Sequence, residues 1–243
     1  MTRHLVLFDV DHTLVDVLRF HEPVYGEVLR ESFGIDGRLR EVEFSGKTTP
    51  NILRELAAHH GVVADAIEAA LPRMIVRFNS GVLARLDPDL RATVLPGVVE
   101  LLRCLNARGQ VMGVVTGNPP EIGRTVLERA HLLQYFSVSS FGTEARGRSE
   151  LVALAVRRAS DQLRITFKPR EVVVVGDSPH DVAAGKSFGA RTIAIGTGLS
   201  GWDELDAARP DGLFRDCRDF ATVCASIAAN AHVERRHWWK VWQ

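Results

Sequence analysis

The chain of 243 residues is poor in lysine, has no excess of charge of either sign and contains no long apolar run. Its thirty basic and thirty acidic residues cancel, which removes the electrostatic reason to expect nucleic acid or an anionic membrane as a partner. No apolar run approaches bilayer-spanning length, and acidic residues stand where a signal peptide would be apolar. We therefore expect a cytoplasmic protein. The lysines are Lys47, Lys168, Lys186 and Lys240.

Cysteine is also scarce. The chain has three, Cys104, Cys217 and Cys224, and their spacings match neither a metal-binding nor a disulfide pattern. The sequence therefore predicts buried, reduced thiols. The apolar and charged fractions, 46% and 25%, are those of an ordinary globular protein.

One stretch near the start, residues 4–14, combines an apolar run with acidic residues. The run from Leu5 to Phe8 predicts a strand buried on both faces, with Asp9 and Asp11 at its carboxyl end. In extended chain the two carboxylates point the same way, so both can meet one bound group, such as a cation. The alternative is a strand followed by an Asp-rich turn.

The rest of the chain divides into a helical part and an alternating part. Helical spacing predicts helices over 17–33, 50–60 and 63–86, the last interrupted by Pro72, and no strand-like run falls between residues 16 and 91. From residue 95 strands and helices alternate, which implies a parallel sheet with helices on both faces. We expect an α/β core of residues 1–15 and 93–243, with residues 16–92 inserted as an all-helical domain over the first strand's carboxyl end.

Two further expected strands end in residues suited to chemistry. The strand 111–115 is followed by Thr116-Gly117-Asn118, whose hydroxyl and backbone N–H groups suit a phosphate oxygen, although the triplet is equally an ordinary turn. The strand 172–175 is followed by Asp177 and, one helical turn later, by Asp181. These acids complete a cation site, or they form a helix cap with a solvated partner.

These three stretches carry a family resemblance. Residues 9–14 (Asp-Val-Asp-His-Thr-Leu), 116–118 and 176–181 (Gly-Asp-Ser-Pro-His-Asp), with a helical insert after the first, resemble the haloacid dehalogenase superfamily of hydrolases. The position of the insert resembles the phosphoglycolate-phosphatase-like branch. The resemblance covers nearly the whole chain and implies a Rossmann-like three-layer core with a central first strand, plus an inserted helical cap domain.

By that resemblance Asp9 is the nucleophile that attacks phosphorus and forms an aspartyl-phosphate. Asp11 protonates the leaving oxygen and then deprotonates the attacking water. Mg²⁺ is held by the carboxylates of Asp9 and Asp177 and by the main-chain carbonyl of Asp11, because a carboxylate approaches a phosphate dianion only where a cation screens the repulsion. The remaining expected site residues are Thr116, Gly117 and Asn118, which bind the phosphoryl oxygens, and Thr13 and Asp181, which contact the ligating side chains and not the ion itself.

The family pattern also calls for a lysine before the helix that precedes the last motif, and this sequence departs from it. Lys168 lies at the start of the following strand, on the opposite side of the sheet, and is expected to be a solvated charge. Arginine binds phosphate through two parallel hydrogen bonds, so Arg148 or Arg146 is able to replace the lysine. We favour Arg148, which directly precedes a helix expected to begin with Ser149 as N-cap. The alternative is that one or both are surface charges.

The helical insert is expected to contact the substrate. Residues 45–49 form a small polar loop before a helix, and Lys47 in it is expected to reach the leaving group, with an N-capping turn as the alternative. Arg19 and His21 are further candidates.

Three other motifs are expected to lie outside the chemistry. Residues 196–201 satisfy G-x-G-x-x-G after a strand, but the following strand-helix unit is short, which favours a loop at the rim of the site. His59 and His60 are adjacent and cannot share a helix face, which argues against a metal pair. The tail 237–242 holds three tryptophans and is expected to pack against its own domain or a neighbouring subunit.

The sequence therefore predicts a Mg²⁺-dependent phosphatase acting on a small phosphorylated metabolite. A phosphomutase acting on a sugar phosphate would share the aspartyl-phosphate, and a non-catalytic binding module would share the fold, so both stay open. A dehalogenase is disfavoured, because displacement of halide from carbon needs neither Asp11 nor a cation. No nucleic-acid or membrane partner is expected, and a homodimer is left open.

Overall fold

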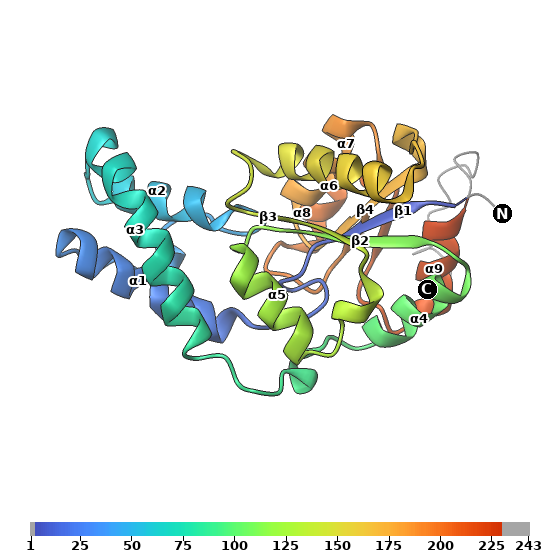
Figure 1. Cartoon of the computed structure of the whole chain (residues 1–243), viewed down its shortest axis with the longest axis horizontal. Helices are drawn as coiled ribbons and strands as arrows, with labels where there is room; N and C mark the ends of the chain where they lie inside the picture. Colours follow the sequence, from blue (N-terminus) through green and yellow to red (C-terminus); the bar gives the residue numbers. More distant parts are fainter. Residues whose placement is uncertain (1–2, 230–243) are drawn as a thin grey trace.

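The computed structural model describes residues 3–229, and the tryptophan-rich tail 237–242 lies outside them. A six-stranded parallel sheet in the order β3-β2-β1-β4-β5-β6 forms the centre of the molecule (Figure 1). The first strand is central, as the resemblance implied. The strands are β1 (Leu5–Phe8), β2 (Val111–Thr116), β3 (Val138–Phe141), β4 (Val172–Gly176), β5 (Arg191–Ile195) and β6 (Gly212–Phe214).

The sheet is covered on both faces, which explains the uninterrupted apolar runs of its strands. Val6 and Phe8 pack into one core cluster and Leu5 and Leu7 into another, because successive side chains of a strand point to opposite faces. Burying each such side chain contributes roughly 1.5–3 kcal/mol relative to leaving it exposed. The helices on the Val6 side are α4 (Val98–Ala107), α5 (Pro120–Arg129) and α9 (Phe220–Ala228). On the Leu5 side lie α6 (Arg148–Leu163) and α7 (Pro179–Phe188), and the short α8 (Trp202–Ala207) packs with Ala194 of β5.

The segment between β1 and the rest of the sheet is helical, and its helices project to one side of the core (Figure 1). They are α1 (Leu18–Phe33), α2 (Thr49–His59) and α3 (Ala64–Leu83). The chain leaves the core through Val15 and returns through Val94, and these two residues form an antiparallel bridge. This narrow neck supports our proposal that residues 16–92 are a separate inserted domain.

The ends of the insert's helices follow the sequence signals, with one exception. Gly34 and Gly61 take positive φ angles of 70° and 81°, which glycine adopts without the penalty that other residues meet. Pro72 was expected to interrupt the third helix, but α3 continues through it. A proline inside a helix costs about 3 kcal/mol, and the buried face of α3, which includes Leu71, Met74 and Phe78, offsets that cost.

The expectation of three reduced thiols is wrong. Cys104 of α4 and Cys224 of α9 form a disulfide with a Cα–Cα distance of 6.5 Å. The two cysteines are separated by 120 residues in the sequence, and only the packing of both helices on the same face of the sheet brings them together. Cys217 is free and buried, as expected.

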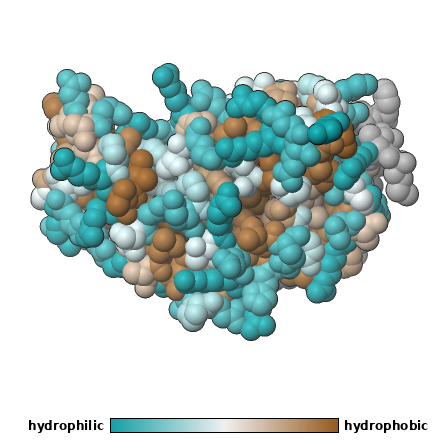
Figure 2. All heavy atoms as spheres, viewed as in Figure 1, coloured by the Kyte–Doolittle hydropathy of each residue, from teal (hydrophilic) through white to brown (hydrophobic). Residues whose placement is uncertain are grey.

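Within residues 3–229, every helix is too short or too polar to cross a bilayer. On the face shown in Figure 2, hydrophobic residues form separate patches between hydrophilic ones instead of one continuous band.

Candidate active site

The carboxyl ends of three adjacent strands meet at one edge of the sheet. β1 pairs with β2 on one side and with β4 on the other. The strand order therefore reverses around β1, and open α/β sheets bind ligands at such a point. Asp9 follows β1, Thr116 ends β2 and Asp177 follows β4, so the topology itself gathers these residues.

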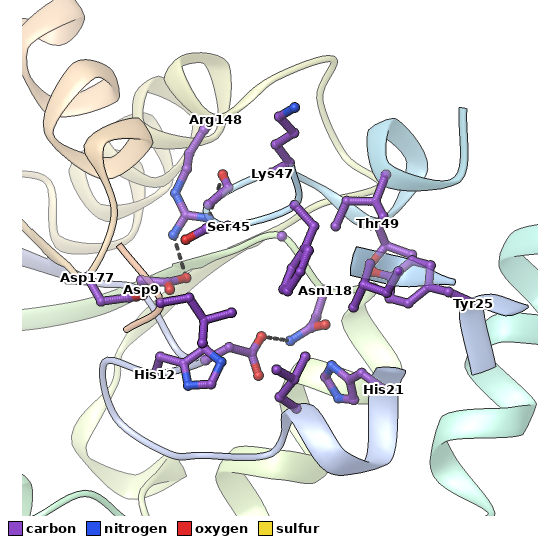
Figure 3. Close-up of a pocket in the computed structure, with 18 residues that line it drawn as sticks. Asp9, His12, His21, Tyr25, Ser45, Lys47, Thr49, Asn118, Arg148 and Asp177 are labelled. Atoms are coloured by element: carbon purple, nitrogen blue, oxygen red, sulfur yellow. Dashed lines mark hydrogen bonds and ion pairs between the residues drawn. The ribbon is translucent and has the colours of Figure 1, made fainter. Parts of the chain in front are cut away.

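The loop after β1 presents Asp9 and Asp11 through a tight turn and not through extended chain. The Val10 carbonyl accepts the backbone N–H groups of Leu14 and Val15 at 2.9 and 3.1 Å, and His12 has a φ of 58°. Both carboxylates still line the same pocket (Figure 3). The Asp11 side chain is held at its Oδ2 atom, which accepts a hydrogen bond of 2.5 Å from the Asn118 amide, while its buried Oδ1 has no protein partner.

Three buried carboxylates form the charged centre of the site. Oxygen atoms of Asp9, Asp177 and Asp181 all lie within 4.8 Å of one another. The Thr13 hydroxyl donates a hydrogen bond of 2.9 Å to Asp177 Oδ1, which orients this carboxylate. The sequence predicted that Asp181 contacts the ligating side chains only, whereas its carboxylate lies in the cluster with Asp9 and Asp177.

Asp181 also belongs to the start of α7. Ser178 is the N-cap residue, its hydroxyl donates to Asp181 Oδ2 at 2.6 Å, and the Ser178 N–H donates to the same atom at 3.1 Å. The helix cap and the carboxylate cluster were alternatives at the level of sequence, and Asp181 takes part in both. The cap fixes Asp181 on a rigid element and leaves Oδ1 directed at the neighbouring arginine.

Arg148 is the cation of the cluster. Its guanidinium pairs with Asp9 Oδ1 (Figure 3) and with Asp181 Oδ1, the second at 2.5 Å, and it also donates to the Val115 carbonyl at 3.3 Å. Arg146 and Lys168 are exposed, and neither lines the pocket. Ser149 was expected to be the N-cap of the following helix, but α6 begins at Arg148 with Gly147 at the N-cap.

The electrostatics of the cluster favour an additional cation. Burial raises the pKa of Asp9 to about 7, against the lowering influence of Arg148, and burial with the charges of Asp9 and Asp181 raises the pKa of Asp177. The pKa of Arg148 is raised by Asp181 and Asp9 despite the opposing effect of burial. Since three carboxylates face one guanidinium, the fully ionised cluster is short of positive charge, and a divalent ion with oxygen ligands fits that deficit.

The turn after β2 closes the next side of the site. Thr116 is fully buried, and its hydroxyl accepts the Asn118 N–H at 3.2 Å. A side chain on Gly117 would run into the carbonyl of Lys47, and the Gly117 carbonyl accepts the N–H of Thr49 at 2.9 Å. Glycine is needed here because the insert approaches the strand end so closely.

The insert provides the wall opposite the carboxylates, and the pocket between them is partly open to solvent. Lys47 lines this pocket, but its ammonium pairs with Glu55 at 2.7 Å. Thr48 stands at the N-cap of α2, but its side chain makes no capping hydrogen bond. His21 lines the pocket, whereas Arg19 is exposed and pairs with Asp87.

Sequence reasoning missed most of this wall. The missed residues are Leu18, Tyr25, Leu39, Phe44 and Ile52. They are apolar or aromatic residues of the kind that an ordinary core contains, so no local signal distinguishes them. The expected rim position of residues 196–201 agrees with Leu199 in the pocket wall.

A family model described as a haloacid dehalogenase-like hydrolase matches residues 4–189. The chain belongs to this family. As a haloacid dehalogenase-like hydrolase it is 33% identical over 136 residues to a phosphoglycolate phosphatase of Synechococcus elongatus, covering 55% of this chain and 60% of that protein. It is 28% identical over 210 residues to the probable phosphatase IndB of Dickeya dadantii, covering 85% of this chain and 86% of that protein.

A solved structure of the same fold is the β-phosphoglucomutase of Clostridium difficile. It has a TM-score of 0.71 at 12% identity and covers 93% of this chain and 97% of that one. The expected α/β fold and family are confirmed. The match with the Synechococcus phosphatase spans less than two thirds of that relative's length, and the fold is shared with a mutase, so activity and substrate are argued below as proposals.

Proposed function

We propose that this hydrolase is a Mg²⁺-dependent phosphatase that cleaves a small phosphorylated metabolite through an aspartyl-phosphate on Asp9. The buried cluster of Asp9, Asp177 and Asp181, paired with a single arginine, is the observation that carries the proposal. The two curated relatives named above as phosphatases support it.

The cluster suits Mg²⁺, a cation with a strong preference for oxygen ligands. We propose that the carboxylates of Asp9 and Asp177 and the main-chain carbonyl of Asp11 hold it, with Asp181 as a further candidate ligand. The bound ion would supply the positive charge that lets an anionic nucleophile approach a phosphate dianion.

The side chains and backbone groups of the site have separate roles in the proposed reaction. Asp9 attacks phosphorus, and Arg148 fixes the orientation of its carboxylate through the buried ion pair. The Thr116 hydroxyl and the backbone N–H groups of Gly117 and Asn118 bind phosphoryl oxygens. Asp11 gives its proton to the leaving oxygen and later takes one from water, and its free Oδ1 atom is available for both transfers.

We place the enzyme in the cytoplasm, where small phosphorylated metabolites are made and consumed. The Cys104–Cys224 disulfide is the observation that argues for a more oxidising compartment. A phosphomutase acting on a sugar phosphate is the second candidate, because a mutase has the same fold. The two differ in product: a phosphatase releases inorganic phosphate, and a mutase returns an isomeric sugar phosphate.

The nucleophile is tested by Asp9→Asn, which removes the attacking charge with little change in shape. We expect turnover of p-nitrophenyl phosphate to fall by about 10⁴-fold or more, and EDTA to abolish the activity of the unaltered enzyme until Mg²⁺ is restored. Asp36→Asn, at an exposed position on the insert, is the matched control and should keep full activity. Retained turnover in Asp9→Asn, or activity untouched by EDTA, would show that the proposal is wrong.

A further inference from the structure

The pocket is chemically divided between the strand ends and the insert. The side formed by the strand ends is charged. The insert side combines apolar and aromatic residues with polar ones and is built from α1, the segment before α2 and α2 itself. Its apolar or aromatic members are Leu18, Tyr25, Leu39, Phe44 and Ile52, and Leu199 of the loop after β5 lines the rim of the pocket on the side of Asp177. The leaving group of a phosphate ester bound at Asp9 would extend toward this wall.

The permanent cations that line the pocket in the described part of the chain are Lys47 and Arg148, and both are paired with carboxylates. Lys47 lies 2.7 Å from Glu55 and 3.9 Å from Glu43. Neither glutamate lines the pocket, and Glu43 also lies 3.4 Å from His180. With both lining cations paired, a carboxylate on the leaving group would lose its hydration without gaining an unpaired cation, which is unfavourable.

Leu199 gives a second, independent indication. Its side chain is 48% exposed at the rim of the pocket, so it contributes little to the folded core. A large apolar side chain directed at a binding pocket recovers its burial when an apolar ligand covers it.

His21 is a buried polar residue on the insert side of the pocket, which Ser45 and Thr49 also line. It is 5% exposed, its Nε2 atom is buried without a protein partner, and it lines the pocket below Asn118 (Figure 3). Burial lowers the pKa of His21, which favours the neutral ring. A neutral imidazole nitrogen pairs with a hydroxyl, and a buried polar atom without a partner is unfavourable until a ligand provides one.

We propose that the substrate is the phosphate ester of an uncharged, largely apolar alcohol that carries one further hydroxyl, which hydrogen-bonds to His21 Nε2. This inference rests on the phosphatase activity proposed above. It separates the chain from relatives named for phosphoglycolate, whose leaving group carries a carboxylate, because every lysine and arginine among the described residues that line the pocket is already paired.

The charge preference is tested with phenyl phosphate and 4-carboxyphenyl phosphate, assayed with Mg²⁺ for phosphate release. We expect kcat/KM to be roughly 10-fold or more higher for phenyl phosphate, because the carboxylate loses its hydration without an unpaired cation to receive it. Equal or better cleavage of the carboxylated ester would overturn the inference and leave the phosphatase intact. Failure of the enzyme to hydrolyse either ester would overturn the proposed function itself.

Leu199→Lys tests whether the leaving group lies against the part of the pocket rim formed by Leu199. The position of Leu199 at the rim makes the change compatible with folding. We expect the ratio of kcat/KM for the carboxylated ester to that for phenyl phosphate to rise roughly 10-fold. Leu133→Lys is the matched control, since Leu133 is 41% exposed and lines a different surface cavity, and it should leave the ratio unchanged. An unchanged ratio in Leu199→Lys contradicts the placement of the leaving group.

The hydroxyl contact is tested with 4-hydroxymethylphenyl phosphate and the near-isosteric 4-methylphenyl phosphate. We expect the unaltered enzyme to prefer the hydroxymethyl ester by roughly 5- to 10-fold, the effect of one hydrogen bond. His21→Phe should remove the preference by lowering kcat/KM for the hydroxymethyl ester and leaving kcat/KM for the methyl ester unchanged. His21→Gln should show part of the preference. A preference that is absent in the unaltered enzyme, or unchanged in His21→Phe, overturns the role of His21.

Discussion

At the scale of single residues, Arg148 is the residue that we propose replaces the lysine called for by the family resemblance. A guanidinium presents several donors in a fixed fork, so one side chain reaches both Asp9 and Asp181. A lysine ammonium is a compact point charge and would meet the two carboxylates less well. The arginine therefore does more than replace a charge: it couples the proposed nucleophile to the start of α7.

Arg148→Lys is expected to lower kcat/KM for p-nitrophenyl phosphate by roughly 10- to 100-fold, since Asp9 loses its fixed orientation. Arg148→Met is expected to lower it further and to destabilise the metal-free protein by about 3–5 kcal/mol, because the buried carboxylates lose their partner. Steady-state kinetics and denaturant unfolding measure the two effects.

Arg146→Met is the matched control for Arg148. Arg146 lies in the loop just before α6, is exposed and does not line the pocket. Arg146→Met should change kcat/KM and the free energy of unfolding only slightly. If Arg146→Met lost activity and Arg148→Met kept it, the two arginines would have been assigned in the wrong order.

The sequence allowed several of these residues to be predicted. Asp9, Asp11 and Asp177 follow apolar runs typical of buried strands, and parallel strands bring their carboxyl ends together. The preference for Arg148 followed from its adjacency to a helix start. The N-cap residue of α6 was predicted two positions too late, at Ser149 instead of Gly147, because helix propensity does not determine the exact first residue of a helix.

At the scale of elements, the loop before α2 is the part of the insert most closely seated on the core. Gly46 has a φ of 70°, and a side chain there would run into the Ser178 hydroxyl and lie 2.7 Å from His180 Cβ. The Gly46 carbonyl accepts a hydrogen bond of 3.2 Å from Arg148. The loop therefore lies against the tip of β4 and the start of α7.

Gly46→Ala is expected to lift this loop and to lower kcat/KM by roughly 10- to 100-fold, as small displacements of positioning groups do. Gly34→Ala is the matched control, because Gly34 also has a φ of 70° but no atom lies near its missing side chain. Both variants should lose about 1 kcal/mol of stability from the backbone conformation. Equal activity in the two variants would show that the seating of the loop is irrelevant to turnover.

The sequence predicted the ends of helices where local residues determine them, and it predicted less well where tertiary packing determines whether a helix forms or continues. The helix ends at Gly34 and Gly61 were predicted from glycine alone. The passage of α3 through Pro72 was not, because the stabilising buried face comes from the folded insert. Helix α8 (Trp202–Ala207) was missed because six residues carry too little periodicity to detect.

At the scale of the whole molecule, the disulfide closes a long loop. It joins α4 to α9 across 120 residues, so it restricts the unfolded chain strongly. No spacing rule relates Cys104 to Cys224, and the same holds for the apolar wall of the pocket. Both arise from elements that are distant in sequence and packed only in the fold.

Reduction of the disulfide is expected to lower the free energy of unfolding by about 2–4 kcal/mol. A chromogenic thiol reagent should find no reactive thiol in the native protein, because burial raises the pKa of Cys217 to about 12 and the other cysteines are bonded. It should find one thiol after unfolding without reductant and three after reduction. The double variant Cys104→Ser/Cys224→Ser should not respond to reductant. Three thiols in the unfolded, unreduced protein would exclude the bridge.

The most direct test of the proposed chemistry is to trap the phosphorylated residue. Borohydride reduces an acyl phosphate to a primary alcohol, so an aspartyl-phosphate on Asp9 becomes homoserine. We expect Asp11→Asn, which lacks the base for hydrolysis, to accumulate the intermediate with p-nitrophenyl phosphate and Mg²⁺. Mass spectrometry of the quenched protein should then show homoserine at position 9 and only when the ester is present. Turnover without homoserine at that position, in this variant and in the unaltered enzyme, would contradict Asp9 as the nucleophile.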